Sequence, residues 1–168
     1  MTKKLSGKVA PVTGGSRGIG AASARALADE GANVAISYVA SPDKAEVVVN
    51  ELKAKGVTAR AYKADQASAV EVDQLVKDVA KDFGHLDILV NNAGVAVGGP
   101  IDDANTDTAA LARQDAINVH GVITAIRSAS KLMGDGGRIV TIGSGSVSVP
   151  PKRSRPASSF SRAPKPPS

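Results

Sequence analysis

The stretch Thr13-Gly14-Gly15-Ser16-Arg17-Gly18-Ile19-Gly20 decides the fold of this chain. The apolar residues 8–12 precede it and predict a short buried strand, and residues 21–30 after it favour a helix. The glycines therefore fall in a turn between a strand and a helix, the setting in which a glycine-rich motif carries meaning. A helix that begins there offers free N–H groups and a partial positive charge to a phosphate group. The sequence predicts a pyrophosphate-binding turn, and a plain glycine turn is the structural alternative.

The three spaced glycines have separate expected tasks. Gly14 permits a tight turn that a Cβ would obstruct. Gly18 lets the backbone come close to a bound phosphate, and Gly20 lets the helix lie close to the strand. Their spacing, Gly-x-x-x-Gly-x-Gly, differs from the Gly-x-Gly-x-x-Gly form of the standard dinucleotide fingerprint.

Strand and helix patterns alternate along the rest of the chain. Ser41 is expected to cap one helix, Ser68 to begin the next, and Gly84 to end it. This alternation implies right-handed crossovers and a parallel sheet with helices on both faces. We expect the strand order 3-2-1-4-5. Pro11 is unexpected in the first strand, because proline cannot donate to a central ladder. The expected strands are 8–13, 33–39, 58–63, 86–90 and 138–143, and the expected helices are 21–30, 41–56, 68–84 and 107–132.

Four segments together resemble the short-chain dehydrogenase/reductase family. They are the glycine motif, Ala64-Asp65, Asn91-Asn92-Ala93-Gly94 and Ile117-Asn118-Val119-His120-Gly121, in the same order as in the family. The resemblance covers about residues 5–149 and is closest to the 3-oxoacyl-acyl-carrier-protein reductase branch. It implies a doubly wound, Rossmann-like α/β domain that binds a nicotinamide dinucleotide and reduces the carbonyl of a small-molecule substrate, here a 3-oxoacyl thioester or similar ketone of fatty acid biosynthesis.

The composition narrows the classes of partner. The chain has 168 residues, no cysteine and no apolar run long enough to cross a membrane, and we expect a cytoplasmic protein without a metal. Its net charge of +5 comes from five basic residues after Pro150, and the rest of the chain holds 16 basic and 16 acidic residues. The basic charge therefore belongs to a tail and gives little reason to expect nucleic-acid binding.

The end of the second strand favours NADP (as NADPH) over NAD. A fold that prefers NAD places a carboxylate there for the ribose 2′-hydroxyl, and residues 37–41 contain none. Arg17 lies in the glycine turn, where its guanidinium could pair with a 2′-phosphate. The alternative for Arg17 is an exposed surface arginine.

The resemblance also implies a set of site residues. Asp65 would hydrogen-bond the adenine, Asn91 would hold the adenosine side, and the main-chain carbonyl of Asn118 would hold a water in a proton relay. Helix capping is the alternative for Asp65, and a solvated polar residue is the alternative for Asn118. For Asn91 the resemblance implies a structural role in the sheet as well, which is compatible with cofactor binding. The full expected cofactor set is Thr13, Gly14, Ser16, Arg17, Gly18, Ile19, Gly20, Asp65, Gln66, Asn91, Ala93 and Gly94.

The chain departs from the family after the fifth strand. By resemblance Ser144, or failing that Ser146, would bond the substrate carbonyl, and a tyrosine and a lysine should follow as proton donor and its partner. The only tyrosines, Tyr38 and Tyr62, precede the fourth strand. We therefore expect a C-terminally truncated, inactive dinucleotide-binding domain at 1–149, whose family homo-oligomer interface is incomplete.

Residues 150–168 are rich in proline, serine and basic side chains and predict a disordered tail. Two other interpretations of the chain stay open. It could be a nucleotide-binding or interaction module without catalysis. Alternatively, its tail could be an out-of-frame reading of the missing active-site helix, and the product would then have no function.

Overall fold

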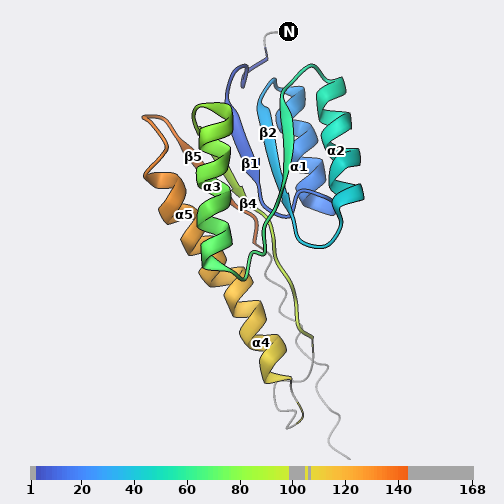
Figure 1. The fold of residues 1–168 in the computed structure, drawn as a ribbon, viewed down its shortest axis with the longest axis vertical. Helices are drawn as coiled ribbons and strands as arrows, with labels where there is room; N and C mark the ends of the chain where they lie inside the picture. The colour runs from blue at the N-terminus through green and yellow to red at the C-terminus, as the bar shows by residue number, and fades with distance from the viewer. Residues whose placement is uncertain (1–2, 99–104, 106, 144–168) are drawn as a thin grey trace, which may run out of the picture.

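The computed structural model describes residues 3–98, 105 and 107–143. Its centre is a five-stranded parallel sheet in the order β3-β2-β1-β4-β5, as predicted (Figure 1). The tail at 150–168 and Ser144 lie outside the described residues, so the predictions for them stay predictions. The strands are β1 (Val9–Val12), β2 (Asn33–Tyr38), β3 (Ala59–Lys63), β4 (Ile88–Asn91) and β5 (Arg138–Thr141).

Helices cover the sheet in two layers. One layer is formed by α1 (Gly18–Asp29) and α2 (Pro42–Ala54), and the other by α3 (Ala69–Phe83) and α5 (Val122–Ser130). The helix predicted at 107–132 is α4 (Thr108–Asp115), continued through the π-helical segment η1 (Ala116–Gly121) into α5. No helix in the described part of the chain is long and apolar enough to cross a membrane.

The core is divided by the sheet, because successive strand residues point to opposite faces. Val12 and Ile36 pack toward α1 and α2, whereas Val9 and Leu89 pack toward α3 and α5. The helices contribute only aliphatic side chains, Ala, Val and Leu, which matches the low aromatic content. The buried helical residues are Ala21, Ala24, Ala28, Ala45, Val48, Val49, Leu52, Val72, Leu75, Val76, Val79, Ala125 and Ala129.

Polar residues fix the ends of the helices. The helix α3 begins and ends where predicted: the Ser68 hydroxyl accepts a hydrogen bond from the Glu71 N–H and caps it, and Gly84 ends it in the left-handed conformation. Ser41 occupies the N-cap position of α2, but its side chain makes no capping hydrogen bond.

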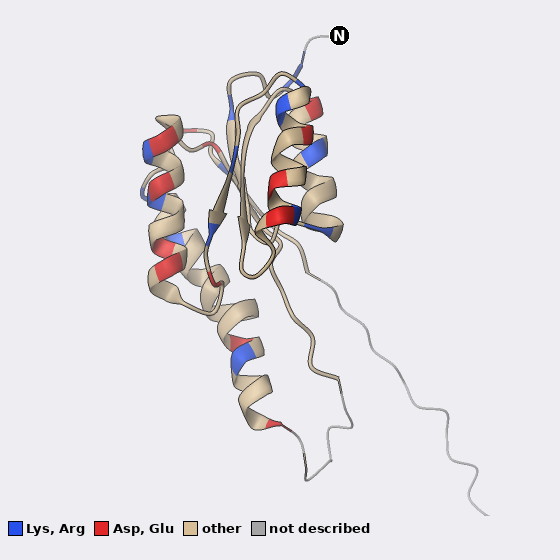
Figure 2. Ribbon diagram, turned by 45° about the vertical axis from the view of Figure 1, so that its right-hand side comes forward, with Lys and Arg blue, Asp and Glu red and all other residues tan. Residues whose placement is uncertain are grey.

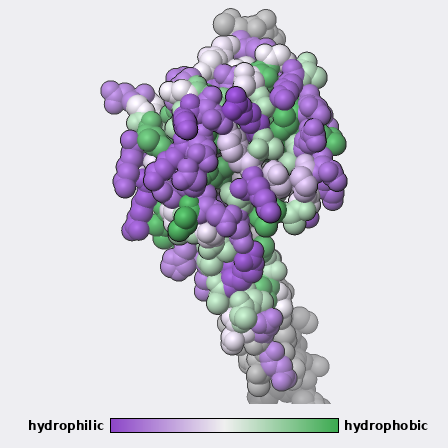
Figure 3. Space-filling view, viewed as in Figure 1, coloured by the Kyte–Doolittle hydropathy of each residue, from purple (hydrophilic) through white to green (hydrophobic). Residues whose placement is uncertain are grey.

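Charged residues gather on the helices, and the strands between them carry few (Figure 2). The face over α2 and α3 is accordingly mostly hydrophilic (Figure 3).

The strand β5 is an exposed edge of the sheet. All four of its residues are exposed, and Val140 retains 49% of its accessible surface. Parallel strands are ordinarily covered on both faces, so β5 differs from β1, β2 and β4 in this chain. An apolar open edge is a surface on which another strand can pair.

Pro11 lies inside the central strand β1 and is buried. The Thr13 N–H donates to the Val90 carbonyl, so by the alternation of a parallel strand the backbone nitrogen of Pro11 also faces β4. The register pairs β1 with β2 at four positions but with β4 at Val12 and Val90 alone. Proline therefore costs the β1–β4 ladder one hydrogen bond, and the fold tolerates this because the ladder to β2 is intact.

Replacing Pro11 with valine should stabilise the domain. A donor for a buried carbonyl is worth about 1–3 kcal/mol. Removing the proline increases the conformational entropy of the unfolded chain, which lowers the stability by about 0.4–1 kcal/mol. We expect a net gain of about 1 kcal/mol in the free energy of unfolding, measured by urea denaturation. Pro42→Ala is the control, because an N–H at the first turn of a helix has no intrahelical partner. An unchanged or lowered stability of Pro11→Val would contradict the assigned strand geometry.

Candidate functional site

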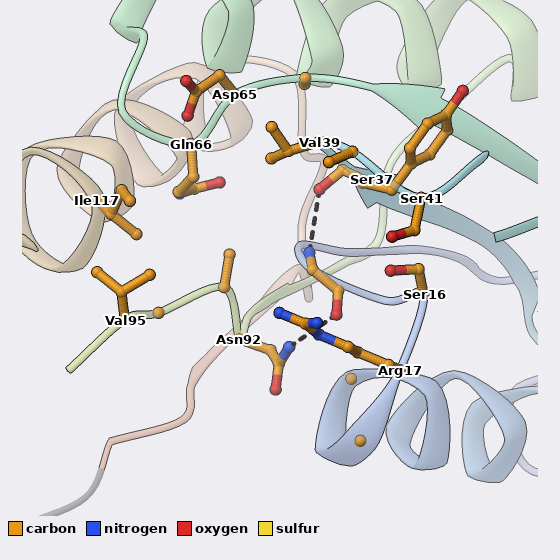
Figure 4. Close-up of a pocket in the computed structure, with 18 of the residues that line it drawn as sticks. Ser16, Arg17, Ser37, Val39, Ser41, Asp65, Gln66, Asn92, Val95 and Ile117 are labelled. Carbon is orange, nitrogen blue, oxygen red and sulfur yellow. Dashed lines mark hydrogen bonds between the residues drawn. The ribbon is translucent and has the colours of Figure 1, made fainter. Parts of the chain in front are cut away.

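A cavity of about 510 Å³ opens where the chain leaves the carboxyl ends of β1, β2 and β4. Five segments line it: the glycine turn, the end of β2, the turn after β3, the segment after β4, and the helix α4–η1 (Figure 4). Open α/β sheets bind their ligands at this edge. The lining residues are Gly14, Ser16–Gly20, Ser37–Ser41, Ala64–Gln66, Asn92–Val95, Arg113 and Ile117.

Asn92 joins the glycine turn to the segment after β4. Its carboxamide nitrogen donates to the carbonyls of Thr13 at 2.9 Å and Gly14 at 3.2 Å. In return, the hydroxyl of Thr13 accepts from the N–H groups of Asn92 and Ala93, each at 3.0 Å. Four hydrogen bonds therefore hold together two segments that are about 80 residues apart in the chain, and Thr13 is almost fully buried beneath them.

The glycine turn is also anchored to β2 and packed under α1. The Gly14 N–H donates to the Ser37 hydroxyl at 3.1 Å, and the Gly15 N–H donates to the Ser37 carbonyl at 3.0 Å. A Cβ on Gly20 would lie 2.4 Å from the Gly14 carbonyl oxygen and 2.5 Å from the Asn92 carboxamide nitrogen. Glycine at position 20 is thus required for a close approach, and the partner is the glycine turn with Asn92 instead of the strand that the sequence analysis named.

The first turn of α1 faces the cavity without an internal partner for its N–H groups. Arg17, at the N-cap position, is extended and gives no side-chain cap, and the first turn contains no acidic residue. Gly18, Ile19 and Gly20 line the cavity directly. The positive end of the helix is therefore available to an anion.

Asp65 lies across the cavity, after β3. Its Oδ1 accepts from the Ala67 N–H at 2.9 Å, and Nη2 of Arg113 reaches both carboxylate oxygens, at 3.2 and 3.0 Å. The backbone hydrogen bond from Ala67 lowers the pKa of the Asp65 carboxyl most, partial burial opposes this, and Arg113 lowers the pKa further. The Asp65 N–H is itself bonded to the Glu71 carboxylate. Asp65 is thus a fixed, ionised acceptor.

Ten of the expected cofactor residues line the cavity. They are Gly14, Ser16, Arg17, Gly18, Ile19, Gly20, Asp65, Gln66, Ala93 and Gly94. Thr13 and Asn91 do not line it and are each 1% exposed. The side-chain nitrogen of Asn91 donates to the Thr141 hydroxyl on the neighbouring strand β5, in keeping with the structural role expected for it in the sheet.

Asn118 lies in the π-helical segment η1 and is fastened through its side chain. Its Oδ1 accepts from the Val95 N–H at 3.0 Å, and its Nδ2 donates to the Val95 carbonyl at 2.8 Å. The side-chain amide of Asn118 therefore joins η1 to the segment after β4, a role that the sequence did not suggest. Whether its main-chain carbonyl holds a water stays a prediction.

The sequence interpretation missed Asn92 and Arg113 as cavity residues. The doublet Asn91-Asn92 held the signal for the first, because only one of two neighbours at a strand end can face the cavity. Arg113 had no local signal, since its partner Asp65 lies 48 positions earlier. Among the described residues no group of three or more histidine or acidic side chains is arranged to hold a metal.

Asn92→Leu should destabilise the domain by about 1–3 kcal/mol, because two partly buried carbonyls lose their donor. Urea denaturation measures the loss. Asn50→Leu, at an exposed position on α2, is the matched control and should change stability by less than about 0.5 kcal/mol. Equal effects of the two substitutions would show that Asn92 does not hold the turn.

The fold and the cavity together define a Rossmann-like α/β domain with a ligand site at the carboxyl edge of its sheet. Residues 8–156 match the family model described as short chain dehydrogenase, and the chain belongs to this family. It is 54% identical over 88 residues to the 3-oxoacyl-[acyl-carrier-protein] reductase FabG of Staphylococcus epidermidis, which is 52% of this chain and 36% of that protein.

Two solved structures give the same picture. A short chain dehydrogenase from Burkholderia cenocepacia in complex with NADP is 48% identical, with a TM-score of 0.81 over 84% of this chain and 57% of that one. A blue fluorescent protein from a metagenomic library in complex with NADPH is 47% identical, with a TM-score of 0.80 over the same shares. The chain spans about half the length of the curated relatives it matches.

Proposed function

We propose that this chain binds NADP(H) and forms the nucleotide-binding part of an oxidoreductase that reduces a carbonyl. The observation that carries the proposal is the open first turn of α1, free of acidic side chains and held in place by Asn92. The two NADP- and NADPH-bound structures support it, because each matches this chain over 84% of its length.

The residues present fit such a cofactor. The first turn of α1 suits its pyrophosphate, and Asp65 suits the amino group of its adenine. Gln66 lines the cavity beside Asp65 and is 4% exposed. When bound, a reduced nicotinamide supplies the hydride.

The phosphate form of the cofactor fits the end of β2. Ser41 and Ser16 line the cavity near Arg17, and none of residues 37–41 carries a negative charge (Figure 4). Arg17 is exposed and makes no ion pair that competes for its guanidinium within the described residues. A 2′-phosphate would meet hydroxyl donors and a cation there, whereas NAD would find no carboxylate for its 2′-hydroxyl.

NADPH should therefore bind more tightly than NADH, and Arg17→Ala should narrow that difference. A charge-assisted hydrogen bond at an exposed site corresponds to about a tenfold change in affinity. Titration of cofactor fluorescence measures both dissociation constants. Arg127→Ala, which removes an exposed arginine of α5 outside the cavity, should leave the ratio unchanged. Equal affinities of the unmodified chain for the two cofactors would refute the NADP preference.

We also propose that a polypeptide of the printed sequence does not turn over a carbonyl substrate, 3-oxoacyl thioesters included. No tyrosine follows Ser144 in the sequence. Tyr62 lines another cavity, and its hydroxyl donates to Asp82. Burial first, and then the Asp82 hydrogen bond and charge, raise the pKa of Tyr62, the opposite of what a ready proton donor needs.

The activity test is the oxidation of NADPH in the presence of a 3-oxoacyl thioester. We expect no rate above the background without protein, since a positioned acid alone is worth about 10²–10⁴-fold. A rate that Ser144→Ala abolishes would show that the chain is catalytically complete. Cofactor binding without turnover is the result that identifies a nucleotide-binding module.

A further inference from the structure

The turn after β3 and the helix α4–η1 form one wall of the cavity together. Asp65 and Gln66 come from the turn, and Arg113 and Ile117 come from the helix. Figure 4 shows Asp65 and Gln66 on the same side of the cavity as Ile117. The wall therefore depends on contacts between two segments that are distant in the chain.

Close packing brings these segments together. A Cβ on Gly121 would lie 2.3 Å from the Gln66 carbonyl oxygen and 2.9 Å from the Gln66 carboxamide nitrogen. Only glycine at position 121 allows the turn to rest on η1 in this way. The contact with η1 thus fixes the position of the turn after β3 at the cavity. Arg113, two turns earlier on the same continuous helix, forms an ion pair with Asp65 in that turn.

The Asp65 carboxylate retains one acceptor position for a ligand. Its Oδ1 accepts from both the Ala67 N–H and Arg113, whereas Oδ2 accepts from Arg113 alone among the residues that the structure describes. A carboxylate oxygen has two acceptor positions, so Oδ2 can take a second donor. The side chain of Arg113 is 53% exposed, and an ion pair so exposed to solvent contributes little to stability. The main effect of Arg113 is therefore to orient the Asp65 carboxylate.

We propose that Arg113 is a positioning residue for recognition of the cofactor base, holding the Asp65 carboxylate so that Oδ2 accepts a hydrogen bond from an exocyclic amino group. The pair Asp65–Arg113 then selects a 6-aminopurine over a 6-oxopurine, which presents an acceptor oxygen to the carboxylate instead of a donor. This inference rests on the proposed function and adds a residue of α4 to it.

The test compares NADPH with reduced nicotinamide hypoxanthine dinucleotide phosphate, which differs at that position of the base. The unmodified chain should bind NADPH about tenfold more tightly than the hypoxanthine analogue, as for one hydrogen bond to a charged group. Arg113→Gln should reduce this ratio at least threefold, mainly by weakening NADPH. Arg113→Lys keeps a cation and should restore most of the ratio, and Arg127→Gln is the matched surface control.

Thermal unfolding of each variant establishes that it is folded, and we expect no change at these exposed positions. If Arg113→Gln weakens both dinucleotides by the same factor, or neither, Arg113 has no part in base recognition and the inference fails while the proposed function stands. If the unmodified chain binds neither dinucleotide, the proposed function fails and this inference with it.

Discussion

The side chain of Asn92 is the interaction on which the site depends. It donates to the carbonyls of Thr13 and Gly14 in the glycine turn. In return, the Thr13 hydroxyl accepts hydrogen bonds from two backbone N–H groups of the segment after β4. Without these four hydrogen bonds, the turn after β1 and the segment after β4 would be two separate loops that follow neighbouring strands. With them, the first turn of α1 has a fixed direction, and the cavity has a rigid floor.

The N–H groups at the start of α1 are free because the sequence places neither a capping side chain nor an acidic residue there. A serine or aspartate at the N-cap would satisfy one of the free N–H groups, and an acidic residue in the first turn would repel an anion. Arg17 and the glycines after it do neither. By contrast, α3 and α4 are capped by Ser68 and Asp107. The helix α1, whose first turn faces the cavity, has no side-chain cap, and neither has α2, whose N-cap residue Ser41 also lines the cavity.

The strand order and most of the cavity could be predicted from the sequence, because hydrophobic periodicity and the glycine motif are local signals. The missed features depend on geometry over a longer range. The strand β4 ends at Asn91, so side-chain alternation buries this residue and turns Asn92 to the cavity. Arg113 meets Asp65 only after the chain folds, and the π-helical turn of η1 has no sequence signature.

The central claim is that the cavity at the carboxyl edge of the sheet binds NADP(H), and NMR titration of the ¹⁵N-labelled chain with NADP⁺ tests it most directly. The account predicts saturable shifts of the amide signals of Gly18, Ile19 and Gly20, together with Gln66, whereas Val70 on the outer face of α3 stays unchanged. A well-dispersed spectrum in which these signals do not move with NADP⁺, or move no more than that of Val70, would contradict it.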